Sequence, residues 1–167
     1  MKWLRKIFQW EKAPDEVLEP RKNETFERYI DRQGFKYFSG SELATYFNRK
    51  IKDPITGEVV HNQYPPRFIW PNFVPTLKVI DKLRGVLNCP VRITSSFRSL
   101  SYNKAVGGAP RSFHKVFKAA DIQADCATPH EVYLILKGWR ERGEFKGGLG
   151  LYKTFVHIDT RGENKDW

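Results

Sequence analysis

Cysteine is scarce in this sequence: only Cys89 and Cys126 occur among its 167 residues. The two lie far apart and lack the CxxC spacing of a zinc knuckle or a redox-active pair, which excludes both types of site. Two buried thiols in a reducing compartment are the simpler interpretation, and a disulfide between them is the alternative. We assign neither cysteine a catalytic role.

Long apolar runs are also lacking, so the sequence offers neither a membrane-spanning helix nor the core of a signal peptide. Near the N-terminus, Trp3, Leu4, Ile7 and Phe8 recur at helical spacing with basic residues between them. This pattern predicts a short helix that docks on the domain, and a helix that contacts a membrane surface is the alternative. Without a signal peptide, we expect synthesis in the cytoplasm.

The sequence has no dense run of like charge, no internal repeat and no biased tract. Its composition, 40% hydrophobic and 14% aromatic, excludes a disordered chain and a solenoid. The net charge is nevertheless +10 and the pI about 9.7, which indicates either a solubilising surface or a polyanionic partner: nucleic acid, anionic lipid or a bacterial envelope. No standard nucleic-acid motif accompanies this charge, so we expect no specific nucleic-acid partner.

Hydrophobic periodicity and capping patterns predict an α+β domain with a small antiparallel sheet flanked by helices. Helices are predicted over 39–47, 75–87 and 99–106 and from Thr128, and strands over 91–94, 118–123 and 155–159. Residues 11–34 favour a linker or a wrapping arm, and the proline-rich segment 52–72 favours loops. We divide the chain into an N-terminal arm with short helices over 1–50 and a domain over 51–167, and we expect a monomer.

Three residues are candidate metal ligands. His114 precedes the predicted strand that carries Asp121, and His157 lies in another strand with Asp159 on the same face. Two histidines and one carboxylate are a typical zinc ligand set in hydrolytic sites, where a fourth position is left for water. The remaining histidines, His61 and His130, are interpreted as solvated.

Several ordered motifs point to one family. They are Thr94-Ser-Ser-Phe-Arg-Ser99, the turn Gly107-Gly108, the block from Ser112 through His114 to Asp121, and Phe155-Val-His-Ile-Asp159. Together these motifs resemble the zinc D-alanyl-D-alanine carboxypeptidases, with the similarity running over about residues 62–161. The resemblance implies a fold like that of these peptidases and of the hedgehog domain, with zinc as the cofactor and His114, Asp121 and His157 as its ligands.

The resemblance also implies roles for other residues. Arg98 is expected to anchor a substrate carboxylate or carbonyl, because its planar fork can hold a carboxylate bidentately. Ser112 is expected to form hydrogen bonds near the site. Many relatives have an acid three residues before the last histidine, where this chain has Thr154. Asp159 is then the best available general base, and orientation of a histidine ligand is its alternative role.

A second departure is Phe117, which stands where the family usually has glycine. Because phenylalanine does not readily adopt a positive φ, we expect the loop to be built differently or the phenyl ring to fill part of the cleft.

The function implied is a zinc metallopeptidase acting on the peptide stems of bacterial peptidoglycan. The candidate bonds are the terminal D-Ala-D-Ala bond and the internal L-Ala-D-Glu bond that related phage lysins cut. Small size and the lack of an export signal favour action at the cell wall after phage lysin-like release, or from within a virion. The alternative is a non-catalytic module, either wall-binding or structural in a virion, that retains the peptidase fold; Phe117 and Thr154 favour it.

Overall fold

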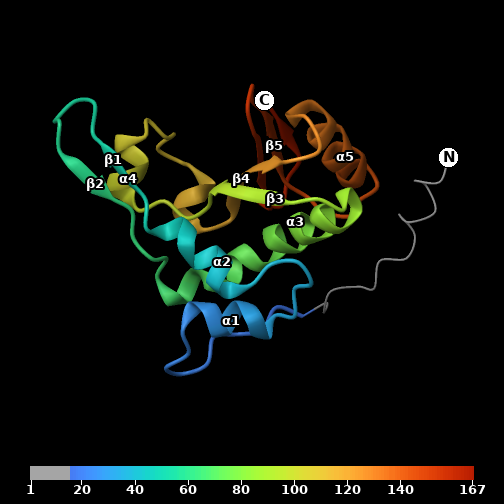
Figure 1. Ribbon diagram of the computed structural model, residues 1–167, viewed down its shortest axis with the longest axis horizontal. Coiled ribbons are helices and arrows are strands. Elements are labelled where there is room, and N and C mark those ends of the chain that lie inside the picture. Colours follow the sequence, from blue (N-terminus) through green and yellow to red (C-terminus); the bar gives the residue numbers. More distant parts are fainter. Residues whose placement is uncertain (1–15) are drawn as a thin grey trace.

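The computed structural model describes residues 16–167, and their order of elements confirms the α+β fold (Figure 1). The strands of the main sheet follow the order β3 (Val91–Ser95), β4 (Ala119–Ala124), β6 (Val156–Asp159), β5 (Gly148–Leu151) and β7 (Lys165–Asp166). Neighbouring strands are antiparallel except β5 and β7, which are parallel. The three predicted strands are confirmed as β3, β4 and β6, whereas β5 and β7 were not predicted.

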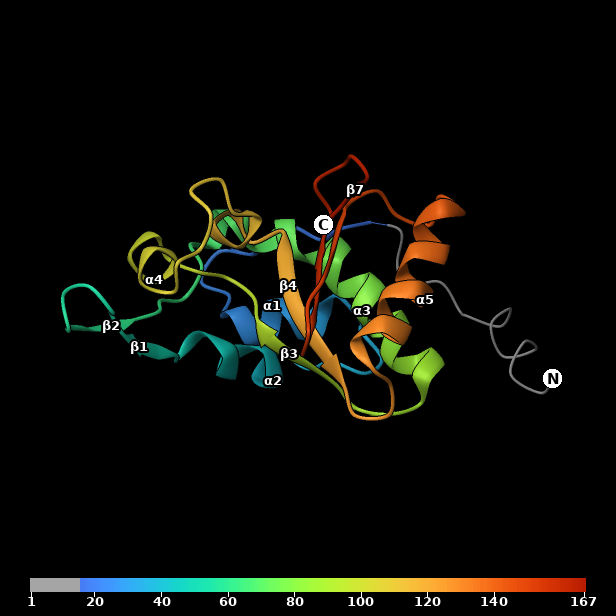
Figure 2. The same ribbon diagram turned by 90° about the horizontal axis from the view of Figure 1, so that it is seen from above.

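Two long helices, α3 (Val74–Leu87) and α5 (Pro129–Glu141), pack side by side against one face of this sheet (Figure 2). Both were predicted. The α5 helix begins at a capping box in which Thr128 and Glu131 each accept a hydrogen bond from the other residue's backbone N–H. Asn88 ends α3 with φ 52°, a conformation that asparagine tolerates. No helix among residues 16–167 is long and apolar enough to cross a membrane.

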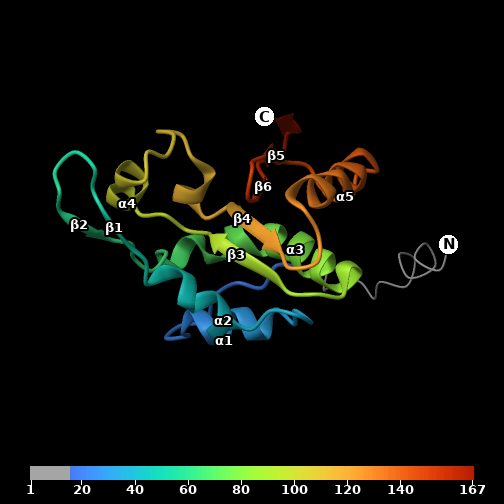
Figure 3. The ribbon, with the colours of Figure 1, turned by 45° about the horizontal axis from the view of Figure 1, so that its top comes forward.

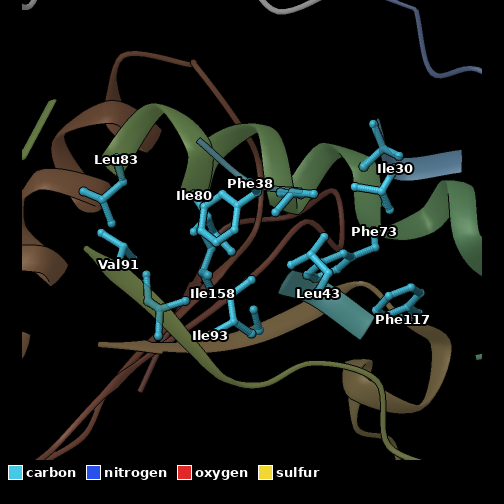
Figure 4. Close-up of a cluster of buried hydrophobic side chains, with 14 of the residues drawn as sticks. Ile30, Phe38, Leu43, Phe73, Ile80, Leu83, Val91, Ile93, Phe117 and Ile158 are labelled. Atoms are coloured by element: carbon cyan, nitrogen blue, oxygen red, sulfur yellow. The ribbon is translucent and has the colours of Figure 1, made fainter. Parts of the chain in front are cut away.

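The hydrophobic core lies between this face and the helices. Figure 4 shows Ile80 and Leu83 of α3 opposite Val91 and Ile93 of β3, and Ile158 of β6 joins the same cluster. Alternate strand residues face the core because side chains in a strand point to opposite faces in turn. The residues between them, Asp121 and His157 included, therefore lie on the other face.

The N-terminal part contains two short helices, α1 (Phe26–Arg32) and α2 (Gly40–Ala44), and Figure 3 shows them on the α3 side of the sheet. The prediction of a linker or a wrapping arm over 11–34 missed α1, whose residues Phe26, Tyr29 and Ile30 are fully buried in the core. The helix predicted over 39–47 is confirmed as α2 followed by a 3-10 turn, η2 (Thr45–Phe47). The helix expected near Trp3 lies outside the described residues, and the division at residue 50 stays a prediction.

A small hairpin, β1 (Lys50–Lys52) and β2 (Val59–His61), projects from the body of the molecule (Figure 1). It is followed by the 3-10 segment η3 (Arg67–Phe73), so the prediction of loops over 52–72 holds only for the residues between these elements. The helix predicted over 99–106 is confirmed as α4 (Leu100–Ala105).

The two cysteines form a disulfide, which corrects the prediction of two free thiols. Cys89 follows α3, and Cys126 lies between β4 and α5. The bond therefore ties one core helix to the loop that leads into the other. A crosslink of this kind stabilises a fold chiefly by restricting the unfolded chain.

Phe117 adopts the left-handed conformation that phenylalanine was expected to avoid, with φ 55° and ψ 42°. Its ring is completely buried and stacks on Phe73 with 4.4 Å between ring centroids, and the rings of Phe26, Phe47 and Phe97 surround it. A left-handed residue costs about 1–2 kcal/mol, whereas burial of a large apolar side chain contributes about 1.5–3 kcal/mol. The left-handed turn is therefore retained with phenylalanine in place of glycine, and the Phe117 ring lies in the core and not in the cleft.

This balance predicts an unusual order of stability at residue 117. Both Phe117→Ala and Phe117→Gly lose the ring and leave a cavity, at a cost of about 3–5 kcal/mol. Only glycine also relieves the backbone strain, so Phe117→Gly should be more stable than Phe117→Ala by about 1 kcal/mol. Urea unfolding of the three proteins measures this order, and an alanine variant at least as stable as the glycine variant would contradict it.

Candidate metal centre

Three side chains converge on the sheet face opposite the core. Asp121 of β4 and His157 of β6 are paired residues on adjacent antiparallel strands, and His157 Nδ1 lies 3.0 Å from Asp121 Oδ1. His114 comes from the 3-10 turn η4 (Phe113–Val116), with its Nε2 3.2 Å from Asp121 Oδ1 and 3.3 Å from His157 Nδ1. All three side chains are buried. The structure therefore brings together the three predicted ligands.

His114 is oriented by its neighbours so that Nε2 faces the other two residues. Its Nδ1 lies 2.6 Å from the backbone oxygen of Ser96, which can only accept a hydrogen bond, so Nδ1 carries the proton. Ser112 caps the turn, and its hydroxyl accepts a hydrogen bond from the His114 amide at 3.4 Å. Ser112 thus helps to position His114. Burial lowers the pKa of His114, which favours the neutral ring that binds metals.

His157 is oriented by Asp159. Its Nε2 lies 3.0 Å from Asp159 Oδ2, which leaves Nδ1 to face Asp121 and His114. Burial by itself lowers the pKa of His157, but the hydrogen bonds to Asp121 and Asp159 outweigh this effect and raise it. In the metal-free protein a proton therefore competes with a metal ion for this ring.

Asp159 lies on the side of His157 away from the other ligands and is completely buried. Its oxygens accept hydrogen bonds from the amides of Gly148 and Arg161 and from the guanidinium of Arg161. Burial would raise the pKa of Asp159, but Arg161 and His157 hold that pKa well below its usual range. The prediction that Asp159 is the general base is therefore not supported by this geometry, which favours the alternative role of orienting His157.

Arg98 lies on the opposite side of the site, against Asp121. Its Nη2 is 2.5 Å from Asp121 Oδ2, and its Nε donates to the Ser95 hydroxyl at 2.8 Å. The Asn62 side chain fixes this segment by donating to the Phe97 carbonyl and accepting from the Ser99 amide. Burial would raise the pKa of Asp121, but the hydrogen bonds with the two histidines outweigh burial and lower it, so the group is ionised.

The other residues considered from the sequence lie elsewhere. His61 is at the end of β2 and His130 is in the first turn of α5, and both are exposed. Thr154 is an exposed residue before β6 whose carbonyl accepts a hydrogen bond from Gln123. No further carboxylate among residues 16–167 forms a hydrogen bond with any of the three candidate ligands.

Arg161 and Asn62 were not among the site residues predicted from the sequence. Arg161 follows the strand bearing His157 and Asp159, and that proximity was the only signal in the sequence. Asn62 lies at the start of the region of similarity, in a segment predicted to be a loop. Arg161 bonds to Asp159, only two residues before it. Asn62 bonds to Phe97 and Ser99, which lie far along the chain, so no local pattern reveals its contacts.

The donor set fits zinc. One oxygen and two imidazole nitrogens converge, and each histidine has its second nitrogen bound to an acceptor that fixes the ring. Structures of catalytic zinc sites show this combination of three protein ligands with a supporting outer shell. The lowered pKa values of Asp121 and His114 also suit metal binding, whereas the raised pKa of His157 means that the metal must displace a proton there.

In a comparison with protein families, the model of the family described as Peptidase M15 matches residues 36–159. This range contains all three candidate ligands together with Arg98 and Asp159. No curated protein and no solved structure matches the chain.

We predict that the purified protein binds about one zinc ion per chain and that His114→Ala abolishes this binding. The matched control is His130→Ala, which removes an exposed histidine and should leave the metal content unchanged. The affinity should fall as the pH is lowered, because protonation of His157 opposes coordination. Elemental mass spectrometry and zinc titration at several pH values measure both effects. Equal zinc contents in the wild type and His114→Ala would contradict the site.

Proposed function

Because the chain belongs to the peptidase M15 family, we propose that it is a zinc-dependent hydrolase that cleaves the peptide stems of bacterial peptidoglycan. The observation that carries this proposal is the convergence of His114, Asp121 and His157 on one face of the sheet. Their buried, oriented donors are what a hydrolytic metal site requires.

The proposed chemistry divides between the metal and the chain. When bound, zinc would polarise a peptide carbonyl and lower the pKa of a coordinated water to about 7. Asp159 holds the His157 ring with Nδ1 directed at the site, and the Ser96 carbonyl does the same for Nε2 of His114. These fixed rings favour catalysis because no reorganisation of the ligands is needed during the reaction.

Arg98 is the proposed anchor for a substrate carboxylate. Its Nε and Nη2 bind Ser95 and Asp121, whereas Nη1 forms no hydrogen bond with any residue of the described part of the chain. The side chain is still partly exposed, at 17%. A free guanidinium edge beside the candidate metal site suits peptide stems, which carry carboxylates next to the bonds that such enzymes cut.

Two bonds are candidate substrates: the terminal D-Ala-D-Ala bond, cut by a carboxypeptidase, and the L-Ala-D-Glu bond, cut by an endopeptidase. We propose that the net charge of +10 concentrates the protein on the anionic cell wall. Phage lysin-like release and transport within a virion are the proposed routes to that location.

A non-catalytic wall-binding or structural module remains the second candidate function. Thr154 favours it, because this chain lacks an acid three residues before His157 and Asp159 is bound on the far side of that ring. Phe117 does not favour it, since its ring lies in the core and leaves the site clear.

Hydrolysis of purified peptidoglycan tests the proposal. The zinc-loaded protein should release new amino groups, and mass spectrometry of the products should identify free D-alanine or a new N-terminal D-glutamate. His114→Ala should be inactive, with His130→Ala as the active control. Wall binding without any new amino group, in a preparation shown to contain zinc, would instead support the non-catalytic module.

Arg98 gives a sharper test of substrate recognition. Arg98→Lys keeps a charge near Asp121 but cannot form the planar, bidentate contact with a carboxylate. Since a hydrogen bond to a charged group contributes about 1.5–3 kcal/mol, kcat/KM should fall about 10- to 100-fold for a stem peptide with a free carboxylate. The loss should be much smaller for the same peptide amidated at that carboxylate. Equal losses for the two peptides would show that Arg98 serves only to hold Asp121.

A further inference from the structure

Arg161 connects the surroundings of both histidine ligands. Its Nε and Nη2 bind the two oxygens of Asp159 at 2.8 and 2.5 Å, and Asp159 in turn holds His157. The guanidinium carbon lies 4.3 Å from the ring centroid of Phe113, the residue before His114. The same carbon lies 5.1 Å from the ring centroid of Trp167.

Trp167 also contacts the candidate metal centre directly. Its ring centroid is 5.1 Å from that of His157, and its indole nitrogen donates a hydrogen bond to the Tyr152 hydroxyl at 2.9 Å. The residue is half-exposed, so it lies between the network around His157 and the solvent. Trp167 and Arg161 therefore enclose Asp159 and His157 on the side away from the other ligands.

Two glycines of β5 make room for these side chains. A Cβ atom added to Gly148 would lie 2.6 Å from Asp159 Oδ2 and 2.8 Å from Arg161 Nη2. A Cβ atom added to Gly150 would lie 2.7 Å from the indole nitrogen of Trp167. Such distances are too short for ordinary contacts, so any side chain at either position would displace Arg161 or Trp167.

The strand β7 that leads to Trp167 is fixed by a buried arginine. Arg140 of α5 donates to the carbonyls of Gly147 and Lys165 at 3.0 Å each, and it forms an ion pair with Asp166. Backbone hydrogen bonds join Trp167 to both Leu149 and Leu151 of β5. The pairing of β7 with β5 therefore fixes the backbone of Trp167, and with it the position of the indole.

From these contacts we propose that Arg161 and Trp167 are positioning residues of the metal centre. Arg161 fixes both oxygens of Asp159, so that Asp159 can hold the His157 ring with Nδ1 directed at the ion. Trp167 packs against both Arg161 and His157 and limits the access of water to their hydrogen bonds. The strand β7 therefore contributes to the metal centre, because it leads to Trp167. The inference rests on the proposed zinc site but does not require that the protein be a peptidase.

Zinc affinity, measured by competition with a chromophoric chelator, tests the proposal without any substrate. Loss of an outer partner of a metal-bound histidine typically weakens metal binding 10- to 100-fold. We expect a loss of this size for Arg161→Gln and a partial recovery for Arg161→Lys, which restores the positive charge. Trp167→Leu should weaken binding several-fold. The matched control is Arg142→Gln, which removes an exposed arginine of the same charge and should bind zinc like the wild type.

Thermal unfolding of the metal-free variants separates positioning from a loss of folding. The proposal is supported if Trp167→Leu or Arg161→Lys keeps a cooperative transition near that of the wild type while its zinc affinity falls. It is overturned if the folded variants bind zinc as tightly as the wild type does, or if the wild type binds none. Zinc binding with the expected losses, in a protein that releases no product from peptidoglycan, would support this inference and reject the proposed function.

Discussion

The burial of two ionised carboxylates, Asp121 and Asp159, is the constraint on which the rest of the site depends. A buried carboxylate is costly unless it is paired and hydrogen-bonded. Each of the two is therefore held between an arginine and the same histidine, His157. The result is a chain of alternating partners, from Arg98 through Asp121, His157 and Asp159 to Arg161. Since His157 stands at its centre, both of its ring nitrogens are bound and its orientation is determined from two sides.

The core contributes to the site through Phe117. This residue follows the turn that carries His114, and its left-handed backbone lets the chain pass from that turn directly into β4. The buried ring stacked on Phe73 stabilises this conformation (Figure 4). Aromatic packing from α1 and η3 thus supports the position of a candidate metal ligand. The α1 helix therefore supports the surroundings of His114 as well as the core, because it supplies Phe26 to this packing.

The main elements and the three candidate ligands could be predicted from the sequence, because strand alternation and the motif around His114 are local patterns. The sequence was insufficient where the outcome depends on contacts between distant residues. The disulfide joins cysteines that lie in separate loops, and the role of Asp159 depends on how the His157 ring is turned. The strand β7 is only two residues long and has no periodicity. The α1 helix was a different kind of error, because Thr25 and the apolar spacing of Phe26, Tyr29 and Ile30 indicated it.

The alternation along β6 has a consequence for how the chain finds its native pairing. Val156 and Ile158 enter the core, while His157 and Asp159, the residues between them and after them, face the candidate metal centre. A slip of one residue against β4 would place His157 and Asp159 in the hydrophobic core. It would also place Val156 and Ile158 at the candidate metal centre. A strand misaligned in this way would lose its contacts with the core and the position of its metal ligand at the same time. The geometry of the candidate metal centre and the register of strand pairing therefore depend on the same four consecutive residues, Val156–Asp159.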